Sequence, residues 1–136
     1  MISDNPAWDE FVTAHRWAVL TTLRASGTPS SSVIAYARDG DELVISTPGD
    51  RFKVRCIERN PAVNLCIISN AEPFNFVAVE GVATIQRENL VPPTQAVFDA
   101  IAGTGYKTPD DLAGWIAREG RVILRIRPER VTAVIR

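Results

Sequence analysis

The residues with the clearest potential for binding chemistry are basic ones that follow a Pro-Gly pair at residues 48–49. The pattern predicts a strand before this pair and a helix after it, with Asp50 as the N-cap. Arg51 and Lys53 then fall in the first helical turn, where the helix already carries partial positive charge and unpaired N–H groups. A bound anion would compensate for these two cations, and a phosphate group fits such an arrangement.

The same segment also allows a simpler interpretation. Arg51, Arg55 and Arg59 recur every fourth residue, and such a stripe is typical of a solvated helix face. Lys53 lies off this stripe, between apolar positions of the helix. The residues by themselves therefore leave two alternatives open, an anion site and a charged surface.

The chain offers no self-sufficient set of catalytic side chains. His15 is the only histidine and is expected at a helix end, where the helix dipole favours a cation. The acidic pair at residues 110–111 stands where it would cap a helix. No nucleophile-elbow, P-loop or dinucleotide-binding motif occurs, and one histidine with two cysteines gives no metal-ligand spacing. We expect no catalytic residue and no metal site, so that an enzyme of this sequence would need an organic cofactor.

Composition limits the classes of partner. The chain has 136 residues, 46% hydrophobic and 23% charged, with a formal net charge of −1, which suits one domain over residues 1–136. This charge argues against nucleic-acid binding, although basic residues concentrate at 51–59 and 118–136. No apolar run approaches the roughly 20 residues of a membrane helix, and the N-terminus lacks a signal-peptide pattern. We expect a soluble cytoplasmic protein without a membrane partner, and Cys56 and Cys66 as small core residues.

Apolar periodicity and turn signals predict a mainly β chain of the α+β class. Helices are expected over residues 5–15, 51–59, 91–102 and 109–119. Strands are expected over residues 16–24, 30–38, 42–47, 62–68, 74–86, 122–127 and 130–135, the first three as a meander. Gly81 predicts a bend or bulge within its strand, and Pro128 a hinge between the last two. Because βαβ alternation is absent, we expect a six- to seven-stranded antiparallel barrel with short flanking helices.

Four segments carry a resemblance to a known family: LTTLRASGTPSSSVIAY, STPGDRFKVRCIERNPAVNLCI, FVAVEGVATI and RVILRIRPERV. Their order and spacing resemble the split-barrel flavoproteins related to pyridoxamine 5′-phosphate oxidase. They are most similar to the short actinobacterial branch that uses the deazaflavin coenzyme F420. The resemblance covers nearly the whole chain.

This resemblance implies a split-barrel homodimer with two cofactor sites at the dimer interface. It implies that Arg51 and Lys53 hold the cofactor phosphate and that Arg55 assists them. The residues implied to line the flavin ring and ribityl chain are Ser31, Ser32, Val33, Ser46 and Thr47. Phe52 departs from the motif of this family, which commonly has a small residue at this position. The larger side chain changes the expected shape of the site beside the phosphate.

The implied function is that of a reductase, which passes a hydride between reduced F420 and a small organic acceptor such as an enone, a quinone or a tetrapyrrole. An FMN-dependent oxidoreductase is the main alternative. A non-enzymatic flavin or deazaflavin carrier and a purely structural dimer are two further alternatives. Members of one fold differ in chemistry, so the resemblance does not identify the acceptor.

Overall fold

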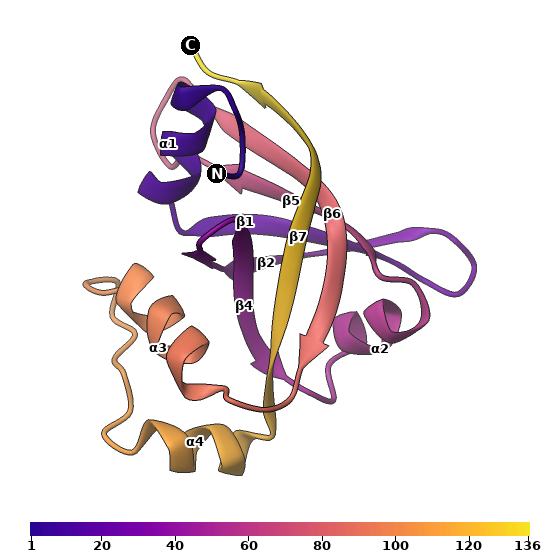
Figure 1. Ribbon diagram of the computed structural model, residues 1–136, viewed down its shortest axis with the longest axis vertical. Helices are drawn as coiled ribbons and strands as arrows, with labels where there is room; N and C mark the ends of the chain where they lie inside the picture. Colours follow the sequence, from indigo (N-terminus) through magenta and orange to yellow (C-terminus); the bar gives the residue numbers. More distant parts are fainter.

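Seven antiparallel strands form one curled sheet in the computed structural model, which describes residues 1–136 (Figure 1). The strands are β1 (Trp17–Leu23), β2 (Pro29–Ala35), β3 (Ala37–Asp39), β4 (Glu42–Pro48), β5 (Ala62–Ile68), β6 (Phe76–Gln86) and β7 (Arg121–Val134). The helices are α1 (Pro6–Ala14), α2 (Phe52–Arg59), α3 (Val91–Ala100) and α4 (Leu112–Glu119). The strand order is β2-β1-β5-β6-β7-β4-β3. The expected mainly β split-barrel fold is confirmed.

The main core fills the inner face of the sheet. Alternate residues of β4 and β7 point into it, and Leu43, Ile45 and Leu124 are fully buried there. Burial of one such aliphatic side chain stabilises the fold by about 1.5–3 kcal/mol. Helix α2 packs against β1 and β6, and Val54 and Cys56 are its most deeply buried residues. A smaller apolar cluster lies on the opposite face, where Val97 of α3 packs on the sheet. Figure 1 shows α3 and α4 together beside β4, and α1 at the opposite end near both termini.

The expected bulge at Gly81 is confirmed, because the register between β6 and β7 shifts between Glu80 and Gly81. A Cβ atom on Gly81 would lie 2.4 Å from the carbonyl oxygen of Arg127, so only glycine fits this approach. Pro128 pairs with Gly81 at the shift, where its missing N–H is tolerated. The expected break at Pro128 is therefore wrong, since β7 continues through it as one strand.

The two hairpins of the expected meander form, but the expected continuous strand over residues 30–38 is wrong, because it is divided into β2 and β3. Strands β2 and β3 lie at opposite edges of the sheet, although only Tyr36 separates them. The Tyr36 side chain is 1% exposed, and its hydroxyl donates to the carbonyl of Val12 at 2.6 Å. Its backbone N–H donates to the carbonyl of Arg16 at 3.0 Å. These contacts turn the chain away from β2 and across to the other edge.

The helix ends and the cysteines show smaller differences. Helix α4 begins at Leu112 rather than at residue 109, and the Asp111 carboxylate accepts from the N–H of Gly114 at 3.0 Å, as expected for a cap. Cys56 is buried as predicted, whereas Cys66 is half-buried on the outer face of β5.

No helix has the combination of length and apolar character that crossing a bilayer requires.

Candidate functional site

The start of α2 presents unused hydrogen-bond donors. Its N-cap is Arg51, not the expected Asp50, and no side chain caps the helix. An arginine side chain can only donate, so it cannot accept from the first amides. The N–H of Lys53 accordingly has no hydrogen-bond partner. The site thus combines an uncapped helix N-terminus with two cationic side chains, which attracts an anion.

A third cation, Arg121, lies close to this helix start. Burial lowers the pKa of Lys53 below its usual value, and the nearby charges of Arg51 and Arg121 lower it further. Burial also lowers the pKa of Arg121, and Glu119 and Arg51 act on it with opposite signs. Three positive charges that raise one another's energy in this way are stabilised together by one bound anion. We call Arg51, Lys53 and Arg121 the cation cluster.

Arg121 is held in place by contacts to three residues of two elements, β4 and α4. Its Nε donates to the hydroxyl of Ser46 at 3.3 Å, and its Nη2 donates to the Ser46 carbonyl at 3.4 Å. Its Nη1 lies 3.7 Å from a carboxylate oxygen of Glu119. The Trp115 ring lies beneath the guanidinium. Arg121 was not among the residues predicted to form the site, although its place directly after the helix-ending Gly120 marks it as the first residue of a strand.

A cavity of about 320 Å³ adjoins Arg121 on the outer side of the sheet. We call it the ring cavity. Of the residues predicted to line a flavin, the structure brings Val33 and Ser46 together here. They are joined by aromatic and aliphatic residues of β1, β2, α3, α4 and the segment between the two helices, namely Trp17, Ile34, Ala35, Val97, Phe98, Ile101, Tyr106 and Trp115. A mostly apolar cavity with a few polar groups at its edge is typical of sites for planar organic ligands.

The other predicted residues lie outside the ring cavity. The hydroxyl of Ser31 pairs with that of Thr21 at 2.8 Å on the exposed outer face, and Ser32 alternates to the other side of β2. Thr47 is 4% exposed, so its side chain belongs to the core side of β4. Arg55 donates to the carbonyl of Asp50 at 2.7 Å, beside the cation cluster.

Phe52, the residue that departs from the motif, is partly exposed between two arginines. The guanidinium of Arg24 lies 5.9 Å from its ring centroid and that of Arg55 lies 5.7 Å away. Each contact is within the range of an attractive cation–π interaction. The large side chain therefore keeps two further cations on the surface next to the cation cluster, a role that the sequence alone does not reveal.

Comparisons with known proteins agree with this architecture. The family model described as pyridoxamine 5′-phosphate oxidase matches residues 5–135. A solved F420 reductase is 26% identical, with 91% of this chain and 94% of that chain covered and a TM-score of 0.73. An FAD-binding protein from Mesorhizobium loti is 18% identical, with coverages of 96% and 94% and a TM-score of 0.72. The General Stress Protein 26 from Bacillus anthracis is 20% identical, with coverages of 93% and 89% and a TM-score of 0.67.

The last two structures are similar in fold, whereas the family model matches the sequence itself. None of the curated proteins matches the sequence. Since the family model spans nearly the whole chain and the curled seven-stranded sheet agrees with it, the protein belongs to the pyridoxamine 5′-phosphate oxidase family, whose members are flavin-binding split-barrel proteins and generally oxidoreductases.

Proposed function

We propose that the protein is a reductase that uses coenzyme F420 and transfers a hydride to a small organic acceptor. The observation that carries this proposal is the cation cluster at the uncapped start of α2, which lies beside the apolar ring cavity. The 26% identity to an F420 reductase, over 91% of the chain, supports the choice of cofactor. An FMN-dependent oxidoreductase is the second candidate, because the cation cluster suits any flavin phosphate.

The residues present fit a phosphorylated cofactor. A phosphate that accepts from Arg51, Lys53 and Arg121 would offset the repulsion that lowers the pKa of Lys53. The free N–H of Lys53 adds a backbone donor. Charge-assisted hydrogen bonds of this kind contribute about 1.5–3 kcal/mol each. The chain therefore supplies both the charge and the directed donors that a phosphate requires.

The ring cavity suits the planar part of such a cofactor. Trp17, Phe98 and Trp115 provide aromatic walls, and Ser46 provides a hydroxyl at the end nearest Arg121. When bound, the cofactor supplies the hydride, and the protein positions the ring and excludes water from it. No cysteine or serine of the chain pairs with His15, so a side-chain nucleophile takes no part in this proposal.

The surface next to the cation cluster favours the deazaflavin over FMN in this proposal. F420 carries an anionic tail of lactyl phosphate and glutamates, which FMN lacks. Arg24 and Arg55 beside Phe52, with Arg59 at the end of α2, form a basic surface that attracts such a tail. Attraction between exposed charges weakens as salt rises, so the tail contribution is salt-sensitive.

We further propose that the protein works as a homodimer with the cofactor sites at the interface. Strand pairing places Val33, Val19, Cys66 and Ala78 in one row across the outer face. Val33 is 69% exposed, an unusual value for valine in a strand. A second copy that covers this face would bury the row and close one side of the ring cavity, which Val33 also lines.

Equilibrium titrations test the choice of cofactor. Cofactor-free protein is titrated with F420 and with FMN at low and at high salt, and binding is followed by fluorescence. We expect F420 to bind more tightly at low salt, with an affinity that falls as salt rises. If FMN binds more tightly than F420, or if the F420 affinity does not change with salt concentration, the FMN-dependent enzyme is favoured. Turnover of reduced F420 with a quinone then separates an enzyme from a carrier.

A further inference from the structure

The segment between α3 and α4 borders the ring cavity. Residues 101–111 join the two helices, and Figure 1 shows them as an extended stretch outside the sheet. Ile101 and Tyr106 are the two residues of this segment that line the ring cavity. Ile101 caps the end of α3 and is 6% exposed, whereas Tyr106 is 63% exposed. Neither residue was predicted to bind a cofactor.

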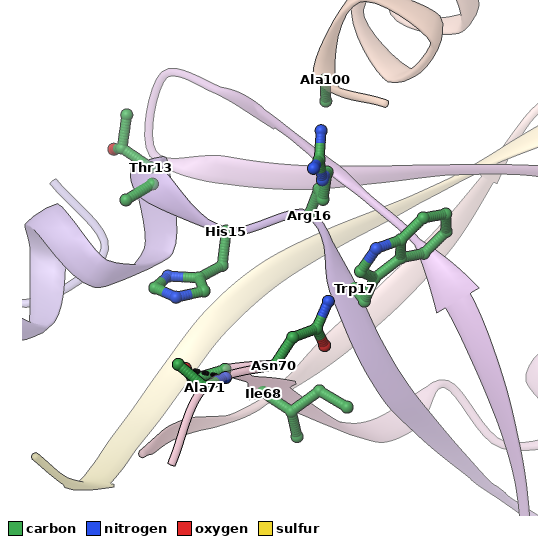
Figure 2. Close-up of a pocket in the computed structure, with 10 residues that line it drawn as sticks. Thr13, His15, Arg16, Trp17, Ile68, Asn70, Ala71 and Ala100 are labelled. Carbon is green, nitrogen blue, oxygen red and sulfur yellow. Dashed lines mark hydrogen bonds between the residues drawn. The ribbon is translucent and has the colours of Figure 1, made fainter. Parts of the chain in front are cut away.

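The part of this segment nearest α3 is held by hydrogen bonds. The backbone N–H of Thr104 donates to the carbonyl of Ile101 at 3.2 Å, and the Thr104 hydroxyl donates to the same carbonyl at 2.6 Å. Figure 2 shows the Arg16 side chain directed toward Ala100 at the end of α3, and its Nη1 donates to the carbonyl of Ala102 at 3.3 Å. The chain as far as Thr104 is therefore fixed to α3 and to the residue before β1.

Residues 105–110, in contrast, are held only at their two ends. At the far end, the Asp111 carbonyl accepts from the N–H of Trp115 at 2.9 Å in the first turn of α4. No backbone or side-chain hydrogen bond involves residues 105–110 themselves. All of them except Pro109 are exposed. Such a stretch moves at a low cost in free energy, because no hydrogen bond has to break. We call residues 105–110 the Tyr106 segment.

Two glycines provide a hinge where the Tyr106 segment begins. The φ angle is 85° at Gly103 and 96° at Gly105. A Cβ atom at either position would meet no heavy atom within 4 Å, so the backbone conformation and not packing requires glycine here. Gly105 directly precedes Tyr106. Its conformational freedom allows the Tyr106 segment to move while Thr104 stays bound to Ile101.

The Tyr106 side chain has no partner of its own in the chain. It borders a mostly apolar cavity, yet it is largely exposed, and its hydroxyl makes no hydrogen bond to the protein. Tyr36, the only other tyrosine, is 1% exposed, and its hydroxyl donates to Val12. An aromatic side chain gains free energy when its ring packs on another flat apolar surface. Tyr106 would make such a contact with a planar ligand in the ring cavity.

We propose that the Tyr106 segment closes over the ligand in the ring cavity, and that Tyr106 is a cofactor-binding residue whose aromatic ring packs on the planar part of the cofactor. The proposed second copy covers the side formed by Val33, so the segment covers a different side, that of α3 and α4. Closure excludes water from the ring and fixes its position. The identity of the ligand rests on the proposed function, whereas the movement rests on the absence of hydrogen bonds.

Cleavage by endoproteinase Lys-C measures closure of the Tyr106 segment. The chain has only two lysines, Lys53 and Lys107, and Lys107 directly follows Tyr106. Lys53 is half-buried within α2, so the ligand-free protein should be cut first at Lys107, into residues 1–107 and 108–136. Saturation with F420 is expected to slow this cut about tenfold, because the protease reaches only the open segment.

Variants test whether Tyr106 makes the contact. Each variant is judged by the ratio of its cleavage rates without and with ligand, so that effects of the substitution on the protease cancel. Tyr106→Ala should bring this ratio close to that of an unprotected site and weaken F420 binding about tenfold, the scale of one lost aromatic contact. Tyr106→Phe should retain the protection, because the ring makes the contact. The control Thr108→Ala changes an exposed residue outside the ring cavity and should leave both values unchanged.

Titration of the same variants with FMN separates this inference from the proposed function. Protection by FMN in a protein that does not bind F420 would support the closing segment and refute the proposed cofactor. F420 binding without protection at Lys107, or with equal protection in Tyr106→Ala, would overturn the closing segment and leave the cofactor in place. Slow cleavage at Lys107 in the ligand-free protein would also overturn it, because the segment would already be held closed. Binding of neither cofactor would refute both proposals.

Discussion

The guanidinium carbon of Arg121 lies 4.6 Å from the centre of the Trp115 ring. A cation over an indole face is stabilised by about 0.5–2 kcal/mol, depending on how far it is desolvated. Trp115 is itself held by Phe98, whose ring meets it edge-on at 5.4 Å. The same guanidinium donates to Ser46 of β4. Arg121 is therefore preorganised between α4 and the sheet, and its charge is directed at the proposed phosphate position before a ligand arrives.

Removal of the Arg121 charge is expected to weaken cofactor binding. Arg121→Ala should lower F420 affinity by about 10- to 100-fold, the loss of one charge-assisted hydrogen bond. Fluorescence titration measures this change. Arg127→Ala is the matched control, because Arg127 is an exposed arginine of the same strand that lies 3.9 Å from Glu129. Equal affinities of the two variants would remove Arg121 from the proposed site.

Lys53 is expected to favour binding at the expense of stability. The pKa of Lys53 is lower in the folded chain than in the unfolded chain. At pH values between these two pKa values, the unfolded state binds more protons than the folded state. The free energy of unfolding therefore rises as pH increases through that window. Below that window the charged side chain destabilises the fold. Lys53→Met should raise Tm and weaken F420 binding about 10- to 100-fold, whereas Lys53→Arg should retain most of the affinity. A lower Tm with unchanged affinity would indicate a structural role instead.

Asp9 is expected to stabilise the fold in a pH-dependent way. Its carboxylate accepts from Arg38 at 3.1 Å and from the N–H of Ile2 at 2.7 Å. The hydrogen bond from Arg38 is the main reason that the pKa of Asp9 lies below its usual value of 3.8. The contribution is complete above that unfolded-state value and is lost as pH falls through the folded pKa.

The substitution Asp9→Asn should therefore lower Tm by several degrees at pH 7, and the difference from the unmodified protein should shrink at pH 2.5. Thermal unfolding followed by circular dichroism measures both values. Asp4→Asn replaces an exposed carboxylate of the same segment and should change Tm little at either pH. A constant Tm difference between pH 7 and pH 2.5 would contradict the linkage to Asp9.

Val33 tests the proposed dimer. A charged residue in the centre of an apolar interface is strongly unfavourable, so Val33→Asp should convert the dimer to a folded monomer of 14.9 kDa. Sedimentation measures the mass, and circular dichroism reports whether the sheet is retained. Ser26→Asp adds the same charge to the exposed turn before β2 and should leave the dimer intact. A stable monomer of the unmodified protein at micromolar concentration would refute the proposal.

Local patterns in the sequence determined most of the secondary structure. Along β6 the alternation of apolar residues correctly predicted that Val77 and Val79 are buried, because successive side chains of a strand point to opposite faces. Gly81 predicted the bulge from a similarly local argument. The basic residues around Arg51 were likewise located correctly at the start of a helix. Each of these features depends on residues only a few positions apart.

Features that depend on distant residues were decided by the tertiary structure. Strand β2 reaches the edge opposite β3 because Tyr36 is buried against Val12 and Arg16, and no pattern of neighbouring residues reveals those contacts. Arg121 lies near the start of α2 and is held there by Ser46 of β4, which is 75 positions away in the chain.

Likewise, only folding placed Trp17 of β1 at the same cavity as Trp115 of α4. Side-chain alternation and helix periodicity are set by bond geometry within a few residues. The choice of strand partners depends on how the whole chain buries both faces of its sheet, and this choice determines which polar groups meet at the site.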